Sequence, residues 1–166
     1  LFRNNKDKFE CYIANDNSNG QIVVSGKNKD LNILVDELEK KSIKNIKLPV
    51  SAPFHSKLMN SATNIMEKEI LNTQFNDSKN LIISNVTSKE VQKSNEIKNL
   101  LIKQIESPVR WRESIIYMIK NNVKNFVEIG PGKILSGMIK RIDREVNIVS
   151  VNELSDLKNI NLNDWF

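Results

Sequence analysis

The sequence of 166 residues contains one cysteine, Cys11, and one histidine, His55. A single cysteine excludes a disulfide within the chain, and one cysteine with one histidine cannot form a Cys/His zinc cluster. Apolar runs extend over only a few residues, so the sequence predicts no transmembrane helix. The remaining composition, with 39% hydrophobic and 27% charged residues, is typical of a globular domain.

Aromatic residues are also few, with two Tyr and two Trp beside a formal net charge of +5. The basic residues are scattered along the chain, whereas single-stranded nucleic acids bind to basic grooves interleaved with aromatic side chains. The composition therefore disfavours nucleic acid as a partner. An acidic protein partner is the other explanation for a basic surface.

The first 50 residues predict the order strand, strand, helix, strand. The β-prone segments 9–14 and 21–25 flank the turn-rich stretch NDNSNG and form a hairpin-like pair. Apolar residues at helical spacing then indicate an amphipathic helix over 30–41. Residues 43–50 alternate apolar and basic side chains, which is typical of a strand.

Beyond residue 50, predicted helices and strands alternate, which favours a mainly parallel sheet flanked by helices. The expected helices cover 55–71, 96–105, 110–120 and 133–142, and the expected strands cover 81–86, 125–129 and 147–151. A polar stretch over 87–95 is expected to form a long surface loop. The predicted fold class is α/β.

His55 lies in the segment SAPFHSKLM, at a predicted strand-to-helix junction. A histidine there can project from the end of a sheet, where the active sites of α/β proteins collect. Its imidazole suits a general base near neutral pH. For a lone histidine, a surface or helix-capping role is the more common alternative.

Four segments of the chain resemble one family. Residues 17–26, NSNGQIVVSG, resemble the NSPGQIVISG of bacterial-type malonyl-CoA:acyl-carrier-protein transacylases, and residues 48–59, LPVSAPFHSKLM, resemble the segment around that family's catalytic histidine. Residues 107–111, SPVRW, resemble its NPVRW, and residues 128–142, EIGPGKILSGMIKRI, resemble its EVGPGKVLTGLIKRI. The order and the spacing of the four segments agree with the family.

The resemblance implies acyl transfer by a Ser-His dyad. In the family, a serine in a GHSxGE turn attacks the malonyl thioester of coenzyme A, and the phosphopantetheine thiol of acyl carrier protein then takes the malonyl group for fatty acid synthesis. His55 matches the general base, and Gln104 matches the residue whose main-chain carbonyl orients that base. Phe54 matches a bulky position that accompanies a preference for malonyl over methylmalonyl, although core packing explains an aromatic residue there equally well. The resemblance implies no bound cofactor and no metal.

The resemblance also implies that the chain holds part of a larger fold. Residues 51–166 are expected to form the C-terminal part of an α/β-hydrolase-like core, and residues 1–50 an incomplete ferredoxin-like subdomain. No GxSxG segment occurs in the sequence, so we expect the nucleophile, the oxyanion donors and the malonyl-binding arginine to lie upstream. The chain alone is then expected to be inactive. Its expected partners are acyl carrier protein, malonyl-CoA and the missing N-terminal half of the same protein, with neither nucleic acid nor membrane.

Two other interpretations stay open. The chain could be a non-catalytic carrier-protein-binding or structural fragment, or the acyltransferase part of a multidomain synthase. The abundance of Asn, Lys and Ile suggests an AT-rich genome. The expected location is therefore the cytoplasm of a bacterium or the plastid (apicoplast) of an apicomplexan parasite.

Three further features each have a structural and a functional interpretation. GPGK at 130–133 could bind an anion at a helix start, although it lacks the spacing of a P-loop and a structural turn is favoured. Cys11 could be a nucleophile, but a small buried thiol is more typical. Arg110 and Arg112, together with other cations such as Lys57, could attract the acidic carrier protein.

Overall fold

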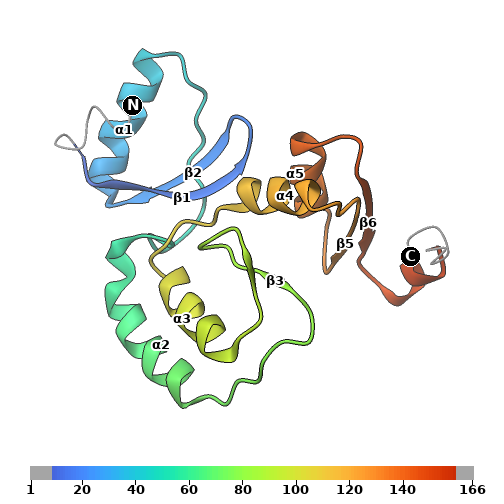
Figure 1. Cartoon of the computed structure of the whole chain (residues 1–166). Helices are drawn as coiled ribbons and strands as arrows, with labels where there is room; N and C mark the ends of the chain where they lie inside the picture. The colour runs from blue at the N-terminus through green and yellow to red at the C-terminus, as the bar shows by residue number, and fades with distance from the viewer. Residues whose placement is uncertain (1–8, 160–166) are drawn as a thin grey trace.

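The computed structural model describes residues 9–159, which form three lobes that meet near helix α4 (Figure 1). The N-terminal lobe contains strand β1 (Cys11–Ser18), strand β2 (Gln21–Gly26) and helix α1 (Asn28–Lys40). The two strands pair antiparallel, and Gly20 in the turn between them adopts a φ of 76°, which glycine accepts without strain. The predicted hairpin and the predicted helix are confirmed, with β1 extending into the segment expected to be the turn.

The strand predicted over 43–50 is wrong. This segment is irregular, and Ile46 and Val50 expose 74% and 62% of their surface. A strand requires a neighbour that accepts and donates its backbone hydrogen bonds. No strand between residues 9 and 159 pairs with this segment, so its alternating pattern has no sheet to join.

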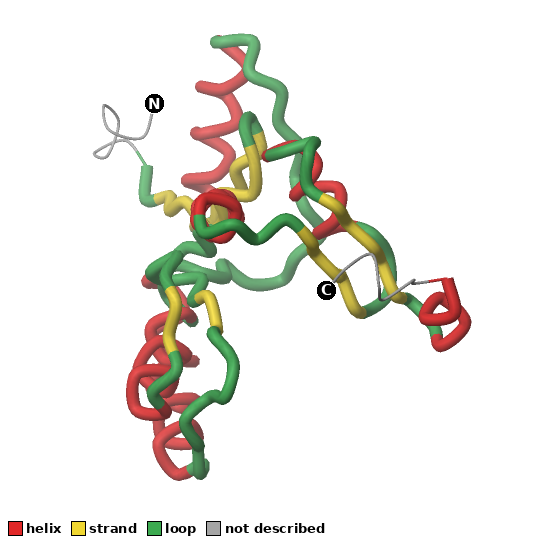
Figure 2. The backbone as a smooth tube through the Cα atoms, turned by 45° about the vertical axis from the view of Figure 1, so that its right-hand side comes forward, coloured by secondary structure: helices red, strands yellow, loops and turns green. Residues whose placement is uncertain are grey.

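The second lobe contains two helices that lie side by side, with a small hairpin beside them (Figure 1, Figure 2). Its elements are η2 (Lys57–Met59), α2 (Asn60–Asn72), β3 (Ile82–Ile83), β4 (Glu90–Val91) and α3 (Ser94–Gln104). The predicted helix over 55–71 is confirmed except at its start, because His55 and Ser56 precede the helical turns. The strand predicted over 81–86 is confirmed only in β3, and the expected loop over 87–95 contains β4 and the first residues of α3.

The third lobe follows the predicted order most closely. It contains α4 (Trp111–Lys120), β5 (Asn125–Ile129), α5 (Ile134–Ile142), β6 (Asn147–Val151) and η3 (Leu154–Asn159). A core forms where α4 and α5 meet the sheet, and its fully buried residues are Ile115, Ile139 and Val146. Trp111 and Phe126, both partly buried, pack against this cluster.

The sheets are smaller than the sequence predicts. In the part of the chain that the structure describes, the strands form three separate pairs, and only β5 and β6 are parallel. The expectation of a mainly parallel sheet is therefore wrong for residues 9–159. A parallel sheet is stable when it has several strands and when helices cover its faces. Residues 9–159 contribute only two parallel strands, β5 and β6, to such a sheet. The observed class is α/β with small sheets.

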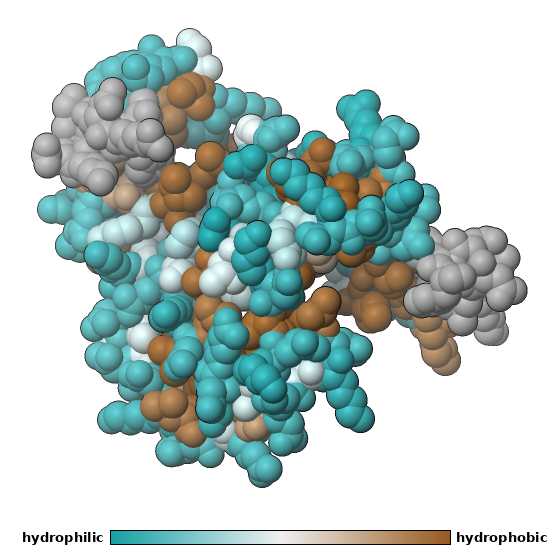
Figure 3. Space-filling view, viewed as in Figure 1, coloured by the Kyte–Doolittle hydropathy of each residue, from teal (hydrophilic) through white to brown (hydrophobic). Residues whose placement is uncertain are grey.

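The surface of the chain is unusually large and apolar. Its accessible area is 11,876 Å², whereas a compact monomer of 19.1 kDa is expected to expose about 8,400 Å². Apolar side chains reach the surface between the lobes (Figure 3). On the β5–β6–α5 lobe, Ile129 and Ile134 expose 81% and 69% of their surface. Among the described residues, no helix has the length and apolar character needed to span a bilayer.

Candidate active site around His55

His55 occupies a backbone conformation that favours glycine. Its φ is 57°, in the left-handed region that non-glycine residues adopt rarely and at a cost in free energy. The hydroxyl of Ser56 donates a hydrogen bond of 2.6 Å to the carbonyl oxygen of Pro53 and closes the turn around His55. Ser56 is 1% exposed, so this bond is shielded from water. A serine at this position could also be expected to cap the helix that follows, but its side chain makes no capping hydrogen bond.

The imidazole of His55 faces the end of helix α3. Its Nδ1 atom lies 3.1 Å from the main-chain carbonyl oxygen of Gln104, the last residue of that helix. Within a helix this carbonyl would accept the N–H four residues later, but that residue is Pro108, which has no N–H. The proline therefore leaves the Gln104 carbonyl free to accept a hydrogen bond from the imidazole N–H. The sequence contained this signal in the SP pair at 107 and 108.

Further polar contacts hold the two segments together. The side-chain amide nitrogen of Gln104 lies 3.3 Å from His55 Nδ1 and donates a bond of 3.1 Å to the carbonyl oxygen of Ser107. At the start of α2, the Asn60 amide donates to the Glu106 carboxylate at 3.1 Å. The turn at His55 and the start of α2 are thus both linked by hydrogen bonds to the end of α3.

Phe54 lies on the surface beside His55. Its side chain is 48% exposed, so it is not part of a core formed by the described residues. Core packing within this chain therefore does not explain the aromatic residue. The half-exposed ring of the residue before His55 is free to contact a bound group or another polypeptide segment.

The GPG turn is occupied by groups of the chain itself. The Glu128 carboxylate accepts hydrogen bonds from the backbone N–H groups of Leu135 and Ser136, at 3.0 and 2.8 Å, at the start of α5. The N–H of Gly132 donates to the Asn152 side chain at 2.5 Å. A carboxylate thus already satisfies the N-terminus of α5, where an anion would bind. This arrangement agrees with the structural interpretation of GPGK.

Cys11 lacks the properties of a nucleophile. Burial, together with the charges of Asp30 and Glu10, raises the pKa of its thiol to about 11. The reactive form of cysteine is the thiolate, which is scarce near neutral pH at such a pKa. The interpretation as a small, partly buried thiol therefore agrees with the structure.

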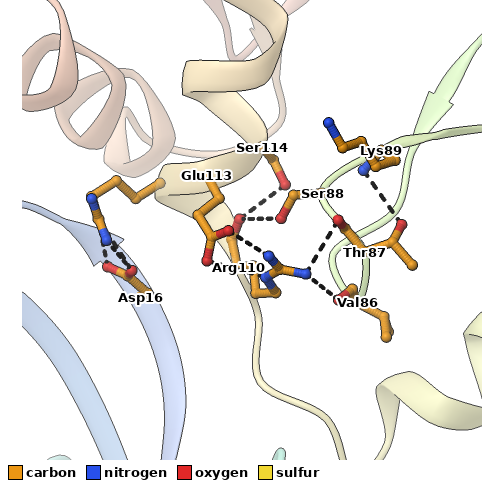
Figure 4. A network of polar contacts seen from close by, with 9 residues as sticks. Asp16, Val86, Thr87, Ser88, Lys89, Arg110, Glu113 and Ser114 are labelled. Carbon is orange, nitrogen blue, oxygen red and sulfur yellow. Dashed lines mark hydrogen bonds and ion pairs between the residues drawn. The ribbon is translucent and has the colours of Figure 1, made fainter.

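Arg110, at the start of helix α4, contacts neighbouring segments of the chain rather than standing free in solvent (Figure 4). The Arg110 guanidinium pairs with Glu113 at 2.5 Å and donates to the carbonyls of Val86 and Thr87 at 3.2 Å. The hydrogen bond from Arg110 is the main reason that the pKa of Glu113 is lowered. These contacts hold the loop before β4 against the start of α4.

The second arginine connects helix α4 to the hairpin. The Arg112 guanidinium binds both carboxylate oxygens of Asp16 on β1, at distances of 2.7 to 3.1 Å. Arg110 and Arg112 thus each have a carboxylate partner within the chain, and the docking rim stays a prediction. Neither Asp16 nor Glu113 was predicted from the sequence, although the spacing of three residues between Arg110 and Glu113 was a signal for an ion pair on one helix face.

No group of three or more His, Cys, Asp or Glu side chains among residues 9–159 is arranged to hold a metal ion. The group that the described residues bring to the candidate site is the His55 imidazole, with Nδ1 at the Gln104 carbonyl. If Nδ1 donates its proton to the Gln104 carbonyl, the other ring nitrogen, Nε2, keeps its lone pair. Such a group can accept a proton from a hydroxyl or thiol that approaches Nε2.

Comparisons with known proteins add a family to this geometry. The family model described as "Acyl transferase domain" matches residues 3–159. "Malonyl CoA-acyl carrier protein transacylase" from Staphylococcus aureus (strain MSSA476) is 39% identical over 152 residues, which are 91% of this chain and 49% of that protein. The protein of the same name from Bacillus subtilis (strain 168) is 38% identical over 142 residues, which are 85% of this chain and 45% of that protein.

A solved structure is also similar to this chain. The crystal structure of malonyl CoA-acyl carrier protein transacylase from Clostridium perfringens matches with a TM-score of 0.90 at 34% identity, covering 99% of this chain and 52% of that one. The chain therefore spans about half the length of the curated relatives it matches.

Proposed function

Because this chain belongs to the acyl transferase domain family, we propose that it supplies the general-base half of a site that transfers malonyl from malonyl-CoA to acyl carrier protein. The observation that carries the proposal is the distance of 3.1 Å between His55 Nδ1 and the main-chain oxygen of Gln104. The two proposed substrates, malonyl-CoA and acyl carrier protein, are those in the names of the similar proteins from Staphylococcus aureus and Bacillus subtilis. The pathway they suggest is fatty acid synthesis.

The proposed chemistry has two half-reactions. In the first, His55 Nε2 removes the proton of a serine hydroxyl while the serine oxygen attacks the malonyl thioester, and the imidazolium then protonates the departing thiolate of coenzyme A. In the second, the phosphopantetheine thiol of the carrier protein attacks the malonyl-serine ester, and the proton returns to serine through His55. When His55 acts as the base, the Gln104 carbonyl accepts a hydrogen bond from Nδ1–H, and it stabilises the imidazolium that forms.

The serine would be supplied by residues outside the 166, since no GxSxG segment occurs among them. We propose that residues 51–166 form part of an α/β-hydrolase-like core and residues 1–50 part of a ferredoxin-like subdomain. The parallel pair β5–β6 with its flanking α5 supports the first assignment, and the order β1, β2, α1 is compatible with the second. The exposed apolar side chains of segment 43–50 and of β5 then mark surfaces that the remainder of the fold would cover.

Phe54 is proposed to limit the size of the acyl group. Its half-exposed ring precedes the imidazole directly, so an α-methyl group on the acyl chain would meet it. In the chain reconstituted with a polypeptide that carries the serine, replacing Phe54 by Ala should narrow the preference for malonyl-CoA over methylmalonyl-CoA, measured as the ratio of the two kcat/KM values. The same ratio in wild type and in Phe54→Ala would show that Phe54 does not contribute to acyl-group selection.

The proposed function is tested by reconstitution. The chain is mixed with a separately expressed polypeptide that carries a GxSxG segment, taken from the part of the Staphylococcus aureus relative outside the matched residues, and malonyl transfer to acyl carrier protein is measured. We expect activity that His55→Ala lowers by a factor of about 10² to 10⁴, the usual contribution of a general base. The matched control is Lys68→Ala on the exposed side of α2, which should keep the wild-type rate.

Carrier-protein binding without any transfer, in a mixture whose two polypeptides form a stable complex, would favour the non-catalytic binding module. Transfer that is unaffected by His55→Ala would show that another group acts as the base. Both results would overturn the proposal.

A further inference from the structure

We propose that the side chain of Gln104 is a positioning residue that controls which ring nitrogen of His55 carries the proton. This inference rests on the proposed function, because it concerns the same imidazole in its role as a base. It starts from the fact that one residue approaches His55 Nδ1 with two different groups. The main-chain oxygen of Gln104 lies 3.1 Å from Nδ1, and the side-chain nitrogen lies 3.3 Å from it.

The orientation of the Gln104 amide is set by a third atom. Its nitrogen lies 3.1 Å from the carbonyl oxygen of Ser107, which can only accept a hydrogen bond. The atom that faces Ser107 must therefore be the –NH₂ nitrogen and not the amide oxygen. Of its two hydrogens, one is bound to Ser107, and the other is available to His55.

The two groups of Gln104 favour opposite tautomers. The main-chain oxygen accepts a hydrogen bond only if Nδ1 carries the proton, whereas the side-chain –NH₂ donates only if Nδ1 has a free lone pair. A neutral imidazole therefore satisfies one of these contacts at a time. In the first tautomer Nε2 has a lone pair and can act as a base; in the second Nε2 carries the proton and cannot.

The side chain and the main chain of Gln104 thus act against each other. The carbonyl stabilises the tautomer that can remove a proton from serine, and the side-chain amide stabilises the idle one. The amide also faces an N–H when the imidazole is protonated, which is an unfavourable contact between two donors. Removing the side-chain donor should shift His55 toward the base-competent form while leaving the carbonyl in place.

This balance can be measured directly because His55 is the only histidine in the sequence. In the full 166-residue chain labelled with ¹⁵N-histidine, the two ring nitrogens give unambiguous NMR signals whose shifts report the tautomer ratio. The spectra are recorded at a pH where the imidazole is neutral. Gln104→Met keeps the length of the side chain and the main-chain carbonyl but removes the donor. The ratio of Nδ1–H to Nε2–H should rise about fivefold, the equivalent of one ordinary neutral hydrogen bond.

A second variant keeps the test informative if Gln104→Met fails to fold. Gln104→Glu replaces the donor by an acceptor of the same shape, so the ratio should rise further than in Gln104→Met. Gln74→Met, an exposed glutamine on the loop after α2, is the matched control and should leave the ratio unchanged. A merely structural role of Gln104 would not produce the order wild type, Met, Glu.

An unchanged or lower ratio in both Gln104 variants would overturn the inference, as would a wild-type imidazole that is entirely in the Nδ1–H form. The measurement is independent of activity. If the ratio shifts as expected but the reconstituted protein transfers no malonyl, the tautomer control stands and the proposed function fails. If transfer depends on His55 but the ratio does not move, the opposite holds.

Discussion

The lobe of α4, β5, α5 and β6 and the lobe of α2 and α3 are stabilised in different ways. In the first, helices and sheet enclose Ile115, which is 0% exposed, together with Ile139 and Val146. In the second, which carries His55, no residue of α2 is buried, and Ile65 on its surface is 66% exposed. The candidate base therefore lies in the less tightly packed of the two lobes.

The difference shows how the position of His55 is determined. Packing holds α4 and α5 in place, whereas specific hydrogen bonds hold the turn at His55: one from Ser56 to Pro53 and one between the imidazole and Gln104. Hydrogen bonds are directional and so fix an orientation, but each contributes little net stability. The hydrogen bonds thus fix the orientation of the His55 imidazole. The surface of the same lobe stays exposed, so another polypeptide segment can pack on it.

The largest expected effect is a difference between the two lobes in how much the loss of an isoleucine side chain lowers the free energy of unfolding. Ile115→Ala should lower the free energy of unfolding by about 2 to 5 kcal/mol, because it removes a fully buried side chain and leaves a cavity. Ile65→Ala, on the exposed surface of α2, should change it by no more than about 0.5 kcal/mol. Urea unfolding of the chain followed by tryptophan fluorescence measures both, since Trp111 packs against the Ile115 cluster.

Equal effects of the two substitutions would contradict the comparison. A large effect of Ile65→Ala would mean that α2 is covered in solution, for example by a second polypeptide. Repeating the measurement at two chain concentrations distinguishes a covered helix from a packed one, because association depends on concentration and packing within one chain does not.

A smaller effect is expected from the turn that carries His55. Ser56→Ala removes the buried hydrogen bond to Pro53 and should lower stability by about 1 kcal/mol. It should also shift the ring ¹⁵N signals of His55, since the turn then no longer fixes the imidazole against Gln104. Ser61→Ala on exposed α2 is the matched control. Unshifted His55 signals in Ser56→Ala would show that the hydroxyl does not support the site.

The smallest effect concerns the start of α3, in the lobe of the candidate base. Hydrogen bonds from the Lys93 ammonium and from the Ser94 N–H lower the pKa of Asp77 to about 2. The folded state therefore favours the carboxylate, whose ordinary pKa is about 3.9. The stabilisation is present above pH 4 and is lost as the pH falls toward 2.

Comparing wild type with Asp77→Asn over this range measures the contribution of the carboxylate. The difference in stability should be constant above pH 4 and should shrink toward zero at pH 2. Because Asp77 is exposed, the difference should be small. In Lys93→Met the stabilisation by Asp77 should be smaller, and its loss should be complete at a higher pH than in wild type, because the folded-state pKa of Asp77 is then less depressed. A difference that is independent of pH would contradict the assigned cause.

Local patterns predicted the third lobe and the hairpin well, and the reason is physical. Strand β6 pairs with β5, and α5 between them in the sequence contacts both strands, so this stretch of sequence contains both the periodic patterns and the elements that pair. The segment 43–50 has the alternation of a strand, but a strand also needs a hydrogen-bonding neighbour, which the described residues lack. A pattern within one segment cannot reveal that absence.

The candidate site shows the same contrast between local features, which the sequence indicated, and features that depend on distant residues. The resemblance pointed to His55 and Gln104, and Pro108 explains physically why the Gln104 carbonyl has no partner in its helix. The left-handed backbone of His55 and the supporting bond from Ser56 were not predicted, because a positive φ at a non-glycine residue depends on tertiary contacts. The ion pair between Asp16 and Arg112 joins residues far apart in sequence, which no spacing rule addresses.

The most direct test of the central claim is the rate at which the serine of the reconstituted protein becomes malonylated in a single turnover, followed by mass spectrometry. This step isolates the removal of the serine proton from transfer to the carrier protein. If His55 is the base, His55→Ala should slow malonylation by a factor of about 10² to 10⁴ without weakening the association of the two polypeptides. Malonylation within about threefold of the wild-type rate in a fully assembled His55→Ala complex would contradict the account.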